Sequence, residues 1–303
     1  MRRSSLAFLA GAALLLAATD ASAYCRTSSC PTGGDNYVTS QVCTPAQAGD
    51  CGKPLYWANP CTEWSLAKAA SNQVPFATME GILKQAFAAW MTASCGNGTP
   101  SIVVTEGEPT DCTKHEYNSD AANANIIAFR DTTWPYEGSA NTLALTTVTY
   151  ALESGEIYDA DMELNSADNQ FTTSDTGVQF DLLSIVTHEA GHFLGLAHTP
   201  DPTATMYPNY IPHSTNLRHL AADDISGICA IYPPGSTDPS CDPTPRHGFS
   251  TLCAADQTGG GGSGGDGGTT NCTCAAPGAA RGGWAAALAI AALAFAARRR
   301  PRR

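Results

Sequence analysis

The sequence predicts an α+β domain. Three runs have the apolar spacing of amphipathic helices, and five short runs are rich in the β-branched and aromatic residues of strands. A turn at 153–156 separates the last two strand-like runs, which indicates an antiparallel hairpin. The expected helices are 78–92, 181–194 and 221–231. The expected strands are 55–57, 102–104, 125–129, 143–150 and 157–164.

Each expected helix has a start signal. Thr78 and Asp181 are short polar residues that can cap a helix N-terminus. The third helix carries Asp223 and Asp224 in its first turn, where carboxylates stabilise the helix dipole. In the first helix, apolar side chains recur at intervals of three and four residues, which is typical of a core helix. These side chains are Ile82, Leu83, Ala86, Phe87 and Trp90.

The last expected strand carries three carboxylates of one parity. Asp159, Asp161 and Glu163 alternate with other residues, so all three face one side of the strand. Two interpretations stay open. Carboxylate oxygens are the ligands that calcium prefers, but a solvated strand face gives the same alternation and is the commoner cause.

The two ends of the chain differ in composition from its centre. Arg2 and Arg3, an apolar run and Ala21-Ser22-Ala23 together form the pattern of a secretory signal peptide. The apolar run is shorter than the ~20 residues of a membrane span. The expected division is a signal peptide at 1–23, a cysteine-rich extension at 24–53, the main domain at 54–234, a Pro/Cys-rich then Gly-rich linker at 235–271, and a C-terminal tail at 272–303.

Charge and cysteine content narrow the function class. The formal net charge is −12, and the segment 24–271 has 8 basic and 27 acidic residues. Nucleic-acid binding needs a basic surface, so the composition argues against it. Ten of the twelve cysteines lie between Cys25 and Cys253, and an even number in an exported chain predicts disulfides of unassigned pairing.

The tail combines three features. Cys272-Thr273-Cys274 precedes an apolar run at 284–297, and an arginine cluster ends the chain. An apolar run followed by arginines is typical of a stop-transfer segment with its basic side in the cytoplasm. The run is short for a stable transmembrane span. We therefore expect transient membrane anchoring before the tail is processed.

One stretch predicts a metal site. His188 and His192 are four residues apart, so both lie on one face of a helix. Glu189 stands beside the first histidine, and Gly195 can take the positive φ that turns the chain back to bring His198 round. Three nitrogen ligands with one open position indicate a catalytic site for one zinc ion, because a structural site has four protein ligands.

These residues resemble a known family. His188–His198 matches the metzincin pattern H-E-x-x-H-x-x-G-x-x-H at every fixed position. Met206-Tyr207-Pro208 with Tyr210 resembles the Met-turn of the matrixins, the matrix metalloproteinase branch, and 220–228 resembles the start of their C-terminal helix. The tail is similar to MYXO-CTERM sorting tails, which implies display at the cell surface or release.

The matrixin resemblance implies a fold and a set of roles. The fold would be a twisted mixed sheet with an antiparallel edge strand above the cleft and three helices. Glu189 would be the general base and Met206 would lie beneath the zinc. By position the edge strand would be 143–147, and substrate would pair with it at Leu143, Ala144 and Leu145. The pocket after the scissile bond would be walled by Pro208 and Tyr210.

The expected function is a secreted or surface-displayed zinc endopeptidase, a monomer that acts on proteins or peptides. The tail implies a sorting protease that acts near Cys272 or Cys274. The alternative is a non-catalytic zinc-containing surface adhesin. Glu189 argues against that alternative, because a binding module has no use for a general base.

Overall fold

The computed structural model describes residues 24–29, 41–43, 52–136, 141–235, 241–257 and 267–275 of the 303-residue chain. The expected signal peptide and the apolar run at 284–297 lie outside these residues. Within the described part, no helix has the length and apolar character needed to cross a membrane.

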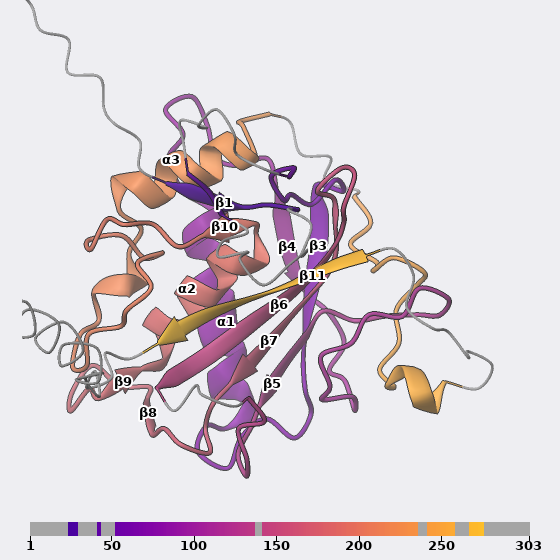
Figure 1. The fold of residues 1–303 in the computed structure, drawn as a ribbon. Helices are drawn as coiled ribbons and strands as arrows, with labels where there is room; N and C mark the ends of the chain where they lie inside the picture. Colours follow the sequence, from indigo (N-terminus) through magenta and orange to yellow (C-terminus); the bar gives the residue numbers. More distant parts are fainter. Residues whose placement is uncertain are drawn as a thin grey trace, which may run out of the picture.

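A six-stranded mixed sheet forms the centre of the domain (Figure 1). Its order is β11-β6-β7-β5-β3-β4. Neighbours from β7 to β4 run parallel, whereas β6 is antiparallel to β7 and β11 is antiparallel to β6. The strands are β3 (Cys61–Leu66), β4 (Val103–Glu106), β5 (Ile126–Phe129), β6 (Thr142–Ala151), β7 (Ile157–Leu164) and β11 (Gly267–Ala275). The predicted α+β class and mixed sheet are confirmed.

Three α-helices pack with this sheet: α1 (Phe76–Met91), α2 (Leu182–Phe193) and α3 (Ala222–Ile231). Phe87 of α1 packs against both the sheet and α2. The centroid of its ring lies 6.4 Å from that of Trp64 in β3 and 5.1 Å from that of Phe193 in α2. Trp90 of α1 donates its Nε1 hydrogen to the Thr187 carbonyl of α2 at 2.8 Å. Two short 3₁₀ helices are η1 (Asn216–Arg218) and η2 (Ala254–Asp256), and a small strand pair is β8 (Phe171–Thr172) with β9 (Phe180–Asp181).

Three sequence expectations need correction here. The expected strand at 55–57 is wrong, because only Tyr56 forms an isolated bridge there, with Glu156. Strand β3 begins later, at Cys61, and the sequence did not reveal it because a strand buried on both faces has no polar alternation. Helix α1 begins at Phe76 after Pro75, so Thr78 lies in its first turn and does not cap it.

The N-terminal extension adds strands to the domain, which its sequence did not predict. Strand β1 (Cys25–Thr27) pairs with β2 (Gln41–Cys43) on one side and with β10 (Leu196–Ala197) on the other. Because β10 directly follows the turn after α2, the extension braces the segment that leads to His198.

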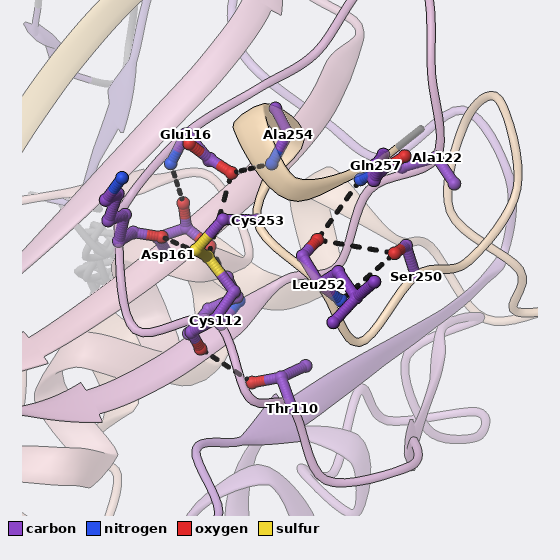
Figure 2. Close-up of a disulfide and its surroundings, with 12 residues drawn as sticks. Thr110, Cys112, Glu116, Ala122, Asp161, Ser250, Leu252, Cys253, Ala254 and Gln257 are labelled. Carbon is purple, nitrogen blue, oxygen red and sulfur yellow. Dashed lines mark hydrogen bonds between the residues drawn. A yellow bond between two sulfur atoms is a disulfide. The ribbon is translucent and has the colours of Figure 1, made fainter. Parts of the chain in front are cut away.

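Disulfides fix the segment after α3. Cys61–Cys241 and Cys112–Cys253 join residues 241–257 to the sheet region, and Cys95–Cys229 joins the end of α1 to α3. Beside the second of these bonds, the Glu116 carboxylate accepts a hydrogen bond from Ala254 N at 2.5 Å (Figure 2). The first part of the expected linker is therefore attached to the domain.

Strand β11 changes the predicted edge of the sheet. The sequence resemblance assigns the edge to 143–147, within β6. In the structure β11 runs along the outer side of β6, from the pair Gly267 and Ala151 to the pair Ala275 and Thr142 (Figure 1). The strand therefore includes both the end of the expected Gly-rich linker, at 271, and the start of the expected C-terminal tail, at 272.

Candidate active site

Helix α2 carries the first two histidines and is fixed at its N-terminus. The Asp181 side chain accepts a hydrogen bond from Ser184 N at 2.9 Å, which confirms the predicted cap. Arg218 donates Nε and Nη2 to the two oxygens of the same carboxylate, at 2.8 and 2.6 Å. A bidentate pair holds a carboxylate in one orientation. Side chains outside the helix therefore help to place His188 and His192.

The chain turns back after α2 at Gly195, whose φ is +96°. A Cβ atom at this position would lie 2.7 Å from the Leu55 carbonyl oxygen, so both the backbone conformation and the space require glycine. Strand β1 supports the turn, because Thr27 N donates to Gly195 O at 3.0 Å. The predicted turn is confirmed, and it returns His198 to the helical histidines.

The three predicted histidines converge through their Nε2 atoms. The Nε2 of His188 lies 3.1 Å from that of His192 and 3.2 Å from that of His198, and the third distance is 3.1 Å. Three nitrogens bound tetrahedrally about 2.0–2.1 Å from one ion lie roughly 3.3 Å apart. His188 and His192 are buried and His198 is half-buried, as befits a site open on one side.

Hydrogen bonds set the tautomers of the two helical histidines. His188 Nδ1 lies 2.7 Å from the Thr205 carbonyl oxygen, and His192 Nδ1 lies 2.9 Å from the Leu196 carbonyl oxygen. A carbonyl accepts only, so each Nδ1 carries the hydrogen and each Nε2 keeps its lone pair. This carbonyl support is the usual arrangement behind metal-bound imidazoles.

Burial keeps these imidazoles neutral. Burial, and then the neighbouring His198, lowers the pKa of His188 to about 3. The same two causes, followed by His188, hold the pKa of His192 well below its usual value. A metal ion binds the neutral imidazole, so the pair is ready to bind a cation at neutral pH. The donor set, its spacing and its protonation state all fit zinc.

Glu189 is fully buried between the helix and strand β6. The Thr146 hydroxyl donates to its Oε2 at 2.6 Å. A hydrogen bond from a fixed donor restricts the rotation of the carboxylate, so Thr146 is a positioning residue. Thr146 could not be recognised from the sequence, because it lies 43 residues from Glu189 on another element and belongs to no motif.

Met206 packs against α2 at Gly191, and two residues hold it there. Its predicted place beneath the zinc stays a prediction. A Cβ on Gly191 would be 2.3 Å from Met206 Sδ and 2.8 Å from Trp90 Cζ2, so the helix approaches the turn as closely as glycine allows. Asp224 accepts hydrogen bonds from Thr205 N at 2.7 Å and Met206 N at 3.0 Å. Asp224 also accepts from Ala221 N, so the start of α3 and the Met-turn share one carboxylate.

The proposed substrate residues occupy two places. Leu143, Ala144 and Leu145 are buried in β6, in register with β7 and β11. Pro208 is half-buried, whereas Tyr210 is fully buried, accepts from Asp181 N at 2.9 Å and donates to Ser214 O at 2.6 Å. Tyr210 thus supports the loop from inside. The substrate roles of these five residues stay predictions.

The carboxylate row on β7 is not a solvated face. Asp159, Asp161 and Glu163 are each at most 2% exposed, so the interpretation favoured by the sequence is wrong. Asp161 accepts from Ile126 N at 2.6 Å and from Glu116 N at 2.9 Å. Partners on other elements make burial of Asp161 and Glu163 tolerable, whereas Asp159 Oδ1 is buried without a hydrogen-bond partner. Strand alternation alone cannot reveal such partners.

Glu163 is paired with a cation of the chain itself. Arg130 lies 2.5 Å from its Oε1, and His115 lies 3.0 Å from its Oε2, which also accepts from the Tyr136 hydroxyl. Calcium needs six to eight oxygen ligands. The oxygens of Asp161 and Glu163 already have partners and an arginine lies among them, so this row does not fit calcium.

A second cluster of metal-binding residue types has another explanation. Cys112, Glu116 and Cys253 lie close together, but the two sulfurs form a disulfide and are not available as thiolates (Figure 2). Among the residues that the structure describes, the three histidines are therefore the cluster best suited to a metal ion.

Comparison with known proteins agrees with this geometry. The family model of the matrixins matches residues 56–233, more than half of the chain. The chain belongs to the matrixin family. The match contains the three histidines, Glu189 and the Met-turn, and it spans the domain from β3 to α3. The matrixin resemblance noted from the sequence is thus confirmed, and the C-terminal tail lies outside the match.

Three human (Homo sapiens) matrixin relatives are similar to the chain. Neutrophil collagenase is 32% identical over 183 residues, which is 57% of this chain and 34% of that protein. Matrix metalloproteinase-20 is 39% identical over 101 residues, which is 33% of this chain and 19% of that protein. Matrilysin is 35% identical over 99 residues, which is 33% of this chain and 34% of that protein. The chain spans about a third or less of these relatives.

Proposed function

We propose that this matrixin is a zinc-dependent endopeptidase, with His188, His192 and His198 as ligands of one zinc ion. The observation that carries the proposal is the convergence of three Nε2 atoms within 3.2 Å of one another beside a buried glutamate. When bound there, zinc would supply a water of lowered pKa, about 7, and would polarise the carbonyl of the scissile bond.

Glu189 performs the proton transfers. Its carboxylate takes a proton from the attacking water as general base and later delivers it to the leaving amine as general acid. Thr146 holds the carboxylate in position through its hydroxyl. The neutral His188 and His192 rings remain fixed through Nδ1, so the ligand geometry persists during the reaction.

The substrate is a protein or peptide in extended conformation. Its backbone adds to β6 at Leu143, Ala144 and Leu145, on the side of the strand that β11 occupies in the structure. Pro208 and Tyr210 form the wall of the pocket that receives the side chain after the scissile bond. The name of neutrophil collagenase refers to the cleavage of collagen. For this chain we propose only that the substrate is a protein or peptide.

The site operates outside the cytoplasm in this proposal. The signal-peptide pattern at 1–23 and three disulfides among the described residues support secretion or surface display. The enzyme is a monomer in this proposal. A sorting protease that acts near Cys272 or Cys274 releases the domain from a transient membrane anchor at 284–297.

Chelation of the full-length protein tests the proposal. We expect casein zymography to show a cleared band that disappears with a zinc chelator and returns when zinc is added. A non-catalytic zinc-containing adhesin would give no band under any of these conditions. Activity that survives complete removal of zinc, checked by elemental analysis, would contradict the proposal.

A further inference from the structure

We propose that residues 267–275 of the chain occupy the substrate position on β6, so that the enzyme is restrained by its own C-terminal segment. The inference rests on the proposed function, because it takes β6 to be the strand that receives substrate. Nothing in the sequence motifs of the catalytic domain identifies this segment.

Backbone pairing is the first observation. Without β11, the order of the sheet makes β6 its edge. Strand β11 pairs antiparallel with β6 over nine residues, and Thr273 and Cys274 are in register with Leu145 and Ala144. These are two of the β6 residues assigned to substrate. One row of N–H and C=O groups cannot pair with two strands at once, so β11 and an external peptide exclude each other.

The second observation is the position of β11 relative to Glu189. The hydroxyl of Thr146 holds Glu189, and Thr146 is in register with Cys272. The paired strand therefore crosses the part of β6 that touches the general base. Its ladder is regular up to Cys274 and shifts between Cys274 and Ala275. The segment thus passes the site as an extended strand, in the form that a peptide substrate takes.

The attachment of the segment is the third observation. Cys112–Cys253 fixes the chain just before η2, and nine residues, 258–266, separate Gln257 from β11. Six of these nine residues are glycine. A tether of nine residues keeps the segment close to the sheet, which corresponds to an effective concentration in the millimolar range. That concentration allows even a weakly pairing strand to compete with dilute substrate.

Proline substitution tests the inference without deleting any part of the chain. In an antiparallel pair, alternate residues direct their N–H groups toward the partner strand. One of the adjacent residues Thr269 and Thr270 therefore donates toward β6, and proline has no N–H to donate. The double variant Thr269→Pro/Thr270→Pro weakens the pairing. The matched control Thr269→Ala/Thr270→Ala keeps both N–H groups.

Peptide hydrolysis by the full-length variants is the first measurement. If β11 is paired nine-tenths of the time, release makes the site about tenfold more available. We expect the proline variant to raise kcat/KM for an external peptide about tenfold through a lower KM, and the alanine variant to stay within about twofold of the parent. Equal kcat/KM in all three proteins would overturn the inference and leave the endopeptidase proposal intact.

Amide hydrogen exchange supplies a measurement that needs no activity. We expect the amides of β6 to exchange faster in the proline variant than in the alanine variant, while those of α1 exchange equally and show that the domain is folded. Unchanged β6 protection would contradict the inference even if no protein cleaved peptide. A failure of all variants to cleave peptide, with faster β6 exchange, would instead contradict the proposed function alone.

Discussion

Gly191 lies between the two helical histidines, and its missing side chain decides how closely α2 approaches the Met-turn. The ring of Trp90 and the sulfur of Met206 occupy the space where a Cβ would be. Interiors are packed at nearly crystalline density, so a single added methyl must displace its neighbours. The motif leaves this position variable, and its requirement for glycine comes from tertiary packing.

Gly191→Ala should lower the free energy of unfolding by about 1–3 kcal/mol, because overpacking forces side chains and backbone to shift. The shift in the midpoint of urea unfolding measures this change in the free energy of unfolding. Gly81→Ala is the matched control, since Gly81 lies in α1 with nothing within 4 Å of an added Cβ. That control should gain about 1 kcal/mol from helix propensity. Equal effects of the two changes would contradict the packing argument.

Thr146→Val should reduce kcat for peptide hydrolysis roughly tenfold while zinc content and KM stay close to those of the parent. A hydrogen bond to a charged group is worth about 1.5–3 kcal/mol, and its loss leaves the Glu189 carboxylate less well oriented. Thr146→Ser keeps the hydroxyl and should restore most of kcat. Steady-state kinetics measures kcat for the three proteins. An unchanged kcat in the valine variant would show that Thr146 does not position Glu189.

At the scale of elements, β7 differs most from its sequence-based prediction. Its carboxylates alternate as on an exposed strand, yet they are buried against Arg130, which follows β5, and against backbone N–H groups of 116 and 126. Burial raises the pKa of Glu163, but the hydrogen bonds of His115 and Tyr136 and the charge of Arg130 outweigh it. The net pKa lies below the usual value.

Glu163→Gln should lower stability at pH 7 by about 3 kcal/mol, because it leaves the half-buried Arg130 without its anionic partner. Since folding lowers the pKa of Glu163, its ionised form stabilises the fold above the usual pKa, and that contribution is lost as pH falls through the folded value. The difference from the parent should therefore shrink below about pH 4.5. Urea unfolding between pH 3 and 7 measures it, with the exposed Glu108→Gln as control.

At the scale of the whole molecule, local patterns predicted local features well. The histidine motif, the Asp181 cap and the turn at Gly195 are each written within a few residues, and the structure has all three. The central strands β5, β6 and β7 were predicted within about two residues, because β-branched runs bounded by turns identify them.

Long-range partners could not be predicted in the same way. Strand β11 is rich in glycine and threonine and shows no alternation of apolar and polar residues, so only its partner β6, far earlier in the chain, makes it a strand. Thr146 and Asp224 act through contacts with residues 43 and 18 positions away. Disulfide pairing likewise depends on the folded arrangement of the chain.

Glu189→Ala separates the binding of one zinc ion by the three histidines from the proton transfers that Glu189 performs. Zinc content by elemental analysis and hydrolysis of a fluorogenic peptide should be measured side by side on the full-length parent and variant. We expect about one zinc per chain in both proteins and a loss of at least about a hundredfold in kcat for the variant. A variant that keeps its zinc and cleaves the peptide as fast as the parent would show that Glu189 is not the general base.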